Sequence, residues 1–229
     1  MKIIAIASGL LASAMLLTGC GLDAIGNPKN QETGTYQVKD KVQQLHLRSG
    51  NGDVTVTESN AAYVSVTETL YWSNDKPRAG HKVEGDTLSV YYDCQSSWGS
   101  CGVNYKVEIP KGLRVNLDAG SGDLTLRSLT GPVDLKAGSG DIAGNGLGGK
   151  KLFAETGSGD IDLKYAVAPD SVELSVGSGN AALTVPDETY DVYTKVDSGD
   201  ASISVKDDNS SPRKISLTAG SGDVTVSAG

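Results

Sequence analysis

Seven side chains with carboxylate or amide oxygens recur in this sequence, each directly after a Ser-Gly or Asn-Gly pair. They are Asp53, Asp123, Asp141, Asp160, Asn180, Asp200 and Asp223. The last six stand 18, 19, 20, 20 and 23 residues apart, and such a nearly fixed period indicates stacked repeats. In a stack their oxygens would form one column, able to accept backbone hydrogen bonds or to bind a hard cation.

The column has two interpretations, because carboxylates about 5 Å apart repel each other by about 1 kcal/mol in water. We expect each carboxylate to accept hydrogen bonds from backbone N–H groups at its own glycine corner, with no cofactor bound. Calcium is the alternative, and its ligands would be Asp123, Asp141, Asp160, Asp200 and Asp223. Calcium-binding β-rolls also carry aspartates in glycine-rich turns, but at a period of about nine residues. The period here is about twice that.

Catalytic motifs are not evident, and we predict that the protein is not an enzyme and has no catalytic residues. Its two histidines, His46 and His81, lie in no recognisable triad or metal-binding motif. The alternative is a carbohydrate-active β-helix enzyme, since paired carboxylates at suitable spacing hydrolyse glycosides.

The residues around each acidic position alternate in polarity. Eight, six and four residues before it, the side chains are mostly apolar or small, as in Val115, Leu117 and Ala119. Apolar residues also stand one and three positions after it, as in Leu124 and Leu126. This alternation indicates strands with one buried face. The last apolar position before the acidic residue and the first one after it are five residues apart, which is an odd number. A continuous strand would therefore turn its apolar side outward, so the chain must turn a corner at the glycines. We predict an all-β fold, a single-domain right-handed parallel β-helix (β-solenoid) with coils of about 18–20 residues.

The amino terminus reads as a leader followed by an anchor. Residues 1–19 form a lipoprotein signal peptide, and Leu17-Thr18-Gly19-Cys20 resembles a bacterial lipobox, in which the cysteine is lipidated. Residues 20–35 would be the lipidated Cys20 and a flexible tether. The predicted location is the extracytoplasmic face of the cell membrane, with the membrane as a partner through the lipid anchor.

The rest of the chain, 36–229, is the predicted solenoid. Residues 36–111 form an irregular, aromatic-rich half, for which a separate sandwich domain is the alternative, and residues 112–229 form the regular repeats. Cys94 and Cys101 are predicted to form a disulfide, because an extracytoplasmic site permits one. Trp98, in the loop between them, is a candidate ligand contact together with Tyr91 and Tyr92, although Trp98 could instead fold back over the open end of the core.

The net charge and the position of the last corner indicate which partners the protein could have. The net charge of −8 argues against nucleic acid, whose binding depends on Lys and Arg neutralising phosphates. The chain stops at Gly229, one short strand after its last corner. We therefore expect the carboxy-terminal coil to be covered by a partner or by a second copy in an end-to-end homo-oligomer.

The lipobox, the tether and the repeated Gly-Ser-Gly-Asp corners together resemble the bacterial putative-adhesin domain, over about residues 36–229. The resemblance implies a β-helix displayed at the cell envelope. The expected role is non-enzymatic surface display, adhesion or interaction with a cell-envelope or protein partner, and a calcium-stabilised binding module is the first alternative.

Overall fold

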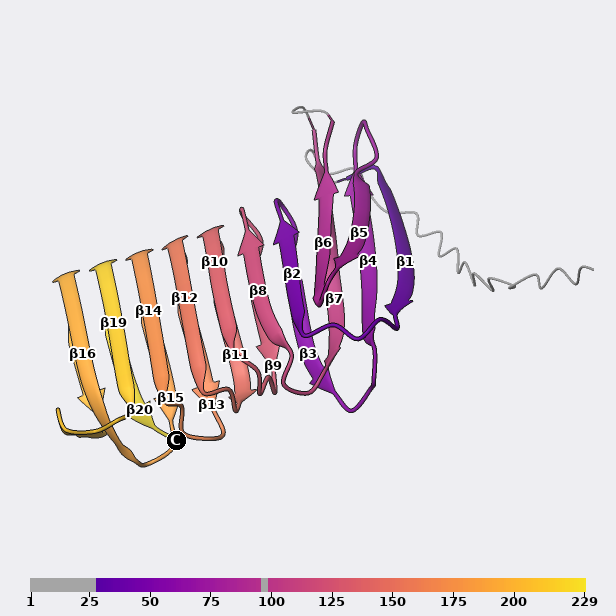
Figure 1. The fold of residues 1–229 in the computed structure, drawn as a ribbon. Coiled ribbons are helices and arrows are strands. Elements are labelled where there is room, and N and C mark those ends of the chain that lie inside the picture. The colour runs from indigo at the N-terminus through magenta and orange to yellow at the C-terminus, as the bar shows by residue number, and fades with distance from the viewer. Residues whose placement is uncertain (1–27, 96–98) are drawn as a thin grey trace, which may run out of the picture.

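The computed structural model describes residues 28–95 and 99–229, which contain twenty strands and no helix. The strands form two ten-stranded sheets that face each other (Figure 1). Sheet A contains, in spatial order, β1 (Asn30–Val38), β4 (Val64–Trp72), β7 (Cys101–Pro110), β3 (Val54–Ser59), β9 (Leu124–Arg127), β11 (Ile142–Leu147), β13 (Ile161–Tyr165), β15 (Ala181–Val185), β20 (Val224–Ala228) and β17 (Ala201–Ser204). Sheet B contains β18 (Lys206–Asp207), β16 (Thr189–Ser198), β19 (Lys214–Ser221), β14 (Ser171–Ser178), β12 (Lys151–Ser158), β10 (Val133–Ser139), β8 (Arg114–Ala119), β2 (Gln44–Ser49), β6 (Thr87–Asp93) and β5 (Arg78–Glu84).

Each repeat is a coil that consists of one sheet B strand, a glycine corner and one sheet A strand. Neighbouring coils pair in parallel, as β10 does with β8 and β12. The predicted buried positions are confirmed: Val115, Leu117 and Ala119 of β8 are buried, and so are Leu124 and Leu126 of β9. The polar residues between them lie on the outer faces, so the apolar core fills the space between the two sheets. The prediction of an all-β fold is confirmed.

The corner glycines are required mainly because the coils are stacked closely. A Cβ atom on the second glycine of any of the seven corners would overlap a backbone carbonyl oxygen of the neighbouring coil; for Gly179 this oxygen belongs to Gly159. Gly159, Gly179, Gly199 and Gly222 also have φ between 125° and 135°, which side chains disfavour. Positive φ, as expected from the sequence, therefore explains the glycine at four corners, whereas steric exclusion applies at all seven.

The coils do not stack in the order of the sequence, which corrects the predicted column. Strand β19 pairs with β14 on one side and with β16 on the other, so the last coil of the chain, β19–β20, lies inside the stack (Figure 1). The segment after β17 forms β18 along the outer edge of β16 and then returns to its inner side. The coil of β2 and β3 is likewise inserted, between β6–β7 and β8–β9.

One end of the stack is capped by antiparallel strands. Strands β1 and β4 extend sheet A beyond β7, and β5 extends sheet B beyond β6. Strand β1 begins at Asn30, within the segment 20–35 that was predicted to be a flexible tether. Residues 30–38 pair with β4 along their whole length, so this part of the segment is a strand of sheet A. The strands of the aromatic-rich half thus lie in the same two sheets as the regular repeats.

The opposite end of the stack is formed by β16 and β17. At the inward-facing positions of this coil, Val192, Thr194 and Val196 are only half-buried, and Ile203 is 39% exposed. The carboxy-terminal coil is covered on both sides by the chain's own coils, contrary to the expectation that a partner or second copy covers it.

Within the described residues, no helix is long and apolar enough to cross a membrane.

Candidate functional site

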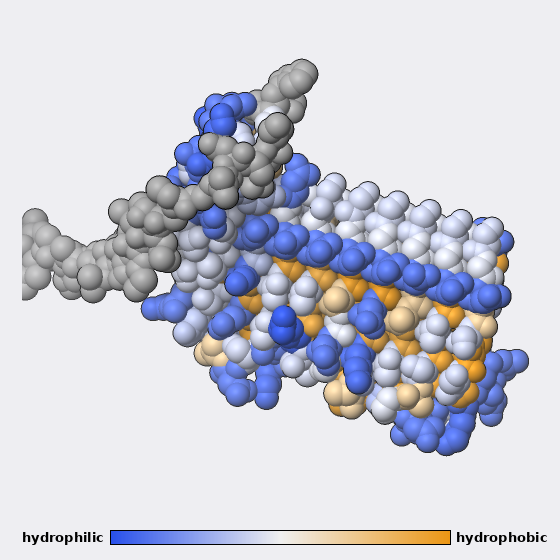
Figure 2. All heavy atoms as spheres, turned by 180° about the vertical axis from the view of Figure 1, so that it is seen from behind, coloured by the Kyte–Doolittle hydropathy of each residue, from blue (hydrophilic) through white to orange (hydrophobic). Residues whose placement is uncertain are grey.

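The Asp and Asn side chains that follow the corner glycines form a column, as predicted, and we call it the corner ladder. In spatial order it consists of Asp53, Asp123, Asp141, Asp160, Asn180, Asp223 and Asp200. A straight row of hydrophilic residues runs along the repeats in the space-filling view (Figure 2). Asp223 precedes Asp200 in this order because of the inserted last coil.

Hydrogen bonds connect each ladder residue to the next coil. The Oδ1 atom of Asp141 accepts the backbone N–H of Asp160 at 2.8 Å, and the Oδ1 atom of Asp160 accepts that of Asn180 at 2.7 Å. The other steps have lengths of 2.9 to 3.1 Å. The donors are backbone N–H groups, as predicted, but they do not belong to the same corner as the carboxylate, where they were expected. The donor lies one coil further, so the ladder joins coils and not the two sides of one turn.

The two ends of the corner ladder differ. At the capped end Asn104 takes the place of an eighth ladder residue, since its Oδ1 atom accepts the N–H of Asp53 at 2.9 Å. At the open end the carboxylate of Asp200 accepts no hydrogen bond within residues 28–95 and 99–229. The ladder thus ends on a hydrogen-bond acceptor that has no donor from this part of the chain.

Calcium would require six to eight oxygen ligands that converge on one point. The corner ladder offers one side chain per coil, and one oxygen of each inner member already accepts an N–H group. In the described parts of the chain, no three His, Cys, Asp or Glu side chains are grouped so that they could hold a metal ion. The calcium alternative at Asp123, Asp141, Asp160, Asp200 and Asp223 stays a prediction.

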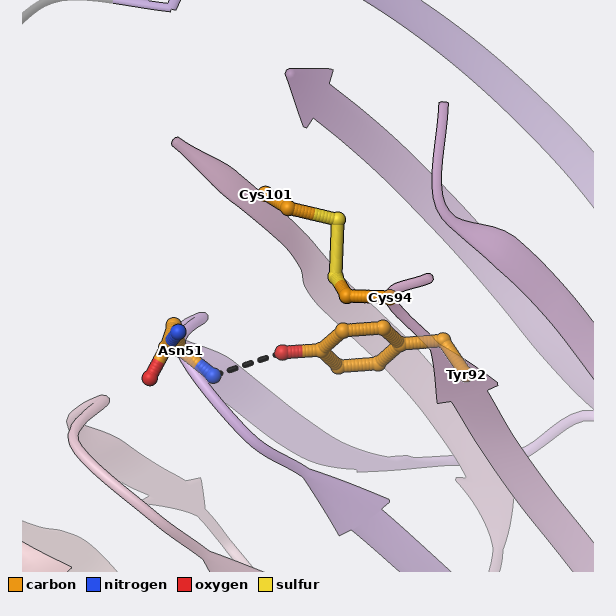
Figure 3. The surroundings of a disulfide bond; sticks show 4 residues. All are labelled: Asn51, Tyr92, Cys94 and Cys101. Carbon is orange, nitrogen blue, oxygen red and sulfur yellow. Dashed lines mark hydrogen bonds between the residues drawn. A yellow bond between two sulfur atoms is a disulfide. The ribbon is translucent and has the colours of Figure 1, made fainter. Parts of the chain in front are cut away.

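The predicted disulfide is confirmed: Cys94 and Cys101 are bonded, with an S–S distance of 2.01 Å and a Cα–Cα distance of 6.2 Å. It joins the end of β6 in sheet B to the start of β7 in sheet A. Beside it, the hydroxyl oxygen of Tyr92 accepts the backbone N–H of Asn51 at 2.6 Å (Figure 3). The disulfide thus links the two sheets at the capped end, and the hydrogen bond ties β6 to the first glycine corner.

Of the predicted ligand-contact residues, the structure describes Tyr91 and Tyr92, and these two do not share a face. Tyr91 lies on the outer face of sheet B and is 44% exposed, whereas the neighbouring Tyr92 is half-buried and used in the hydrogen bond to Asn51. Adjacent strand residues point to opposite faces, which separates the pair. Trp98 lies outside the described residues, and so does Cys20.

A polar cluster between the sheets at the capped end was not foreseen from the sequence. The ring of Tyr36 on β1 stacks on His81 of β5, with centroids 4.1 Å apart. Its hydroxyl donates to Glu68 of β4 at 3.0 Å. Burial raises the pKa of the Glu68 carboxyl, although the hydrogen bond from Tyr36 opposes this. The cluster closes the space between edge strands β1 and β5, and the aromatic enrichment of this half was its only sequence signal.

Comparisons with known proteins agree with this architecture. Residues 39–228 match the family described as Toastrack DUF4097. A putative cell adhesion protein from Clostridium sporogenes has a similar structure, with a TM-score of 0.53 and 13% sequence identity over 87% of this chain and 99% of that chain.

Two other solved structures have lower TM-scores. A putative lipid binding protein from Parabacteroides distasonis has a TM-score of 0.44 and 16% identity, over 88% of this chain and 98% of that chain. A putative adhesin from Bacteroides fragilis has a TM-score of 0.35 and 14% identity, over 89% of this chain and 100% of that chain. A comparison with individual curated proteins found no match. At these identities the likeness concerns the fold alone.

Proposed function

This chain belongs to the Toastrack DUF4097 family, and we propose that it is a membrane-anchored extracytoplasmic lipoprotein. Its solenoid would provide a rigid surface for adhesion or protein interaction and would perform no reaction. The lipobox residues Leu17-Thr18-Gly19-Cys20 support the anchor, because acylation at more than one position gives stable membrane attachment. The disulfide between Cys94 and Cys101 is in keeping with an oxidising compartment.

The observation that carries this proposal is how the repeated acidic residues are used. In the corner ladder each inner side chain accepts an N–H group of the next coil, as Asp141 does from Asp160. The corner ladder, which is the most regular feature of the sequence, therefore holds neighbouring coils together. The result is an extended body with two broad outer faces. Such a body suits the presentation of a contact surface at a distance from the membrane.

We also propose a finer description of the fold, a single-domain right-handed parallel β-helix. Its support is the parallel pairing of successive coils from β2–β3 to β16–β17 and the two sheets shared by both halves of the chain. The inserted first and last coils are departures from a simple helix. An experimental structure at atomic resolution would test the hand of the coils.

The anchor is tested by metabolic labelling of cells with a clickable fatty acid. We expect the wild-type protein to be labelled, to remain in the membrane fraction and to be degraded by protease added to cells whose outer layers have been permeabilised. The Cys20→Ala variant should lose the label. A wild-type protein without label, or one protected from the protease while a cytoplasmic control is also protected, would refute the proposed location.

The contact role is tested by comparing attachment of intact cells to surfaces and to one another, with and without the protein. Loss of attachment on deletion, restored by the wild-type gene, is the expected result. Restoration by the Cys20→Ala variant would show that the role does not depend on the anchor. Unchanged attachment in the deletion strain would refute the contact role.

A further inference from the structure

The outer face of sheet B contains a hollow of about 430 Å³ across β8, β10, β12 and β14, which we call the outer-face hollow. These four strands lie side by side in the middle of the sheet (Figure 1). Pro132, just before β10, lies between the longer side chains Arg114 of β8 and Lys151 of β12, and its short ring leaves room between them. Asn116, Asp134, Phe153 and Glu173 also line the hollow.

An aromatic ring lies at the centre of this polar face. Phe153 is the only phenylalanine of the chain, and it points outward from β12 and is half-exposed. In the sheet register it is directly opposite Asp134 on β10 and Glu173 on β14. The Nζ atom of Lys136 lies 5.9 Å from the ring centroid. An outward ring between two carboxylates does not contribute to the core between the sheets.

The charged groups around the ring are unpaired. The Oδ1 atom of Asp134 is buried from solvent and has no hydrogen-bond partner in the described chain. Arg114, Lys151 and Glu173 form no ion pair or side-chain hydrogen bond with the described residues, whereas Lys206 and Asp187 at the open end pair at 3.3 Å. A buried polar atom without a partner costs about 1–3 kcal/mol. Arg114, Lys151 and Glu173 therefore offer free donors and acceptors in the outer-face hollow, whereas Asp134 can meet a ligand only through its second carboxylate oxygen, because its Oδ1 atom is closed to solvent.

The balance of charge limits what that molecule can be. Arg114 and Lys151 oppose Asp134 and Glu173, so the lining of the outer-face hollow has no formal net charge. An anion would meet the two carboxylates, and a cation would meet Arg114 and Lys151. An uncharged ligand with many hydroxyl groups satisfies both signs, since a hydroxyl both donates and accepts. An aromatic ring adds an apolar surface on which the ring of a sugar can lie.

We propose that the outer-face hollow binds a neutral carbohydrate. A sugar ring stacks on Phe153, its hydroxyls donate to Asp134 and Glu173, and its oxygens accept from Arg114, Lys151 and Asn116. The inference deepens the proposed contact function by naming a ligand class, but its site is separate from the corner ladder.

The test uses the full-length protein purified in a detergent without a sugar headgroup. Saturation-transfer NMR and titration measure binding of cellotriose, maltotriose, mannotriose and chitotriose as neutral probes. Trigalacturonate and a glucosamine trimer serve as the anionic and cationic probes. We expect at least one neutral trisaccharide to bind, and both charged probes to bind at least about tenfold more weakly, a difference of about 1.4 kcal/mol.

Two variants and one control locate the binding. Phe153→Ala and Asp134→Asn should each weaken the binding about tenfold or more, because the first removes the stacking surface and the second weakens a charged acceptor. Tyr193→Ala is the matched control: Tyr193 is an outward aromatic on β16, 58% exposed, in the same cross-strand row as Phe153. It should bind like the wild type. Melting temperatures of all three should stay close to wild type, since these side chains lie outside the core.

The proposal is overturned if no neutral trisaccharide binds, if the charged probes bind as tightly, or if Phe153→Ala retains wild-type affinity. It is also overturned if Tyr193→Ala loses binding as strongly as Phe153→Ala does. Because the purified protein is used, a negative result leaves the fatty-acid labelling and cell-attachment results unaffected. A missing lipid anchor in turn leaves the sugar titration unchanged, so the two proposals fail separately.

Discussion

Replacing Asp141 in the middle of the corner ladder separates the hydrogen bond from the charge. Asp141 is flanked by Asp123 and Asp160, and its Oδ1 atom accepts the N–H of Asp160 at 2.8 Å. Asn180 shows that an amide can do the same, because its Oδ1 atom accepts the N–H of Asp223 at 2.9 Å. Asp141→Asn therefore removes the charge and keeps the acceptor, and Asp141→Ala removes both.

The expected free energies follow from the ladder spacing. With coils about 4.8 Å apart, each charged neighbour repels Asp141 by about 0.9 kcal/mol in water, and two neighbours by about 1.7 kcal/mol. An amide acceptor stabilises by about 0.5–1.5 kcal/mol where a carboxylate gives about 1.5–3 kcal/mol. In Asp141→Asn the lost repulsion and the weaker bond nearly cancel, so its stability should lie within about 1 kcal/mol of wild type. Asp141→Ala should be about 1 kcal/mol less stable than Asp141→Asn.

Urea unfolding followed by circular dichroism measures these differences, and linear extrapolation gives the free energy of unfolding in water. Raising the salt concentration should stabilise the wild type more than Asp141→Asn, because salt screens the repulsion between neighbouring carboxylates. If Asp141→Ala is as stable as Asp141→Asn, the inter-coil hydrogen bond contributes nothing. If Asp141→Asn is destabilised by more than about 2 kcal/mol, the charge has a role that backbone bonding does not explain.

Three further perturbations address the ladder, the corners and the capped end. Millimolar calcium should leave the melting temperature equal to that in chelator; a rise would identify a metal site, since a hundredfold excess over Kd adds about 2.7 kcal/mol. Gly179→Ala should lower the free energy of unfolding by more than about 2 kcal/mol, because its Cβ would overlap the carbonyl oxygen of Gly159. Gly34→Ala, with open space around it, should change little, and equal effects would contradict the steric argument. Burial raises the pKa of Glu68 above its usual value of 4.5, so the folded state binds the proton better than the unfolded state. The wild type should lose stability relative to Glu68→Gln as the pH rises above 4.5, and parallel pH profiles in urea unfolding would refute this.

Local patterns predicted the repeat well, because each depends on a few neighbouring residues. Alternation in a segment such as Val115 to Ala119 determines which face is buried, and the odd shift across Gly-Ser-Gly requires the corner that the structure contains. The disulfide between Cys94 and Cys101 also closes over a short distance in sequence. Such local features can be predicted without knowing which coils are neighbours in the stack.

The order of the coils could not be predicted in the same way. All repeats carry nearly the same inward-facing pattern, so the sequence does not distinguish the strand at Ile215, which pairs with β14, from the strand at Val192, which pairs with β19 instead. The choice depends on long-range packing, and so does the antiparallel cap. The partner of each ladder carboxylate was misplaced because the coil spacing, not the turn, brings the donor within reach. The outer-face hollow did leave a signal in the sequence: Phe153 is apolar at an otherwise polar, outward position.

The insertion of the last coil has a consequence for how the chain folds during synthesis. When residues up to Ser204 have been made, the strand β16 and the strand β17 are complete, but their final neighbours β19 and β20 do not yet exist. The edge of β14 and β15 is then free, and the repeat of β16 and β17 presents a similar pattern to it. Lasting placement of this coil must wait until the segment from Lys214 onward arrives and occupies that edge. The segment 214–229 therefore fixes the position of two coils, and a chain cut before Lys214 lacks the strands that separate β14 and β15 from β16 and β17.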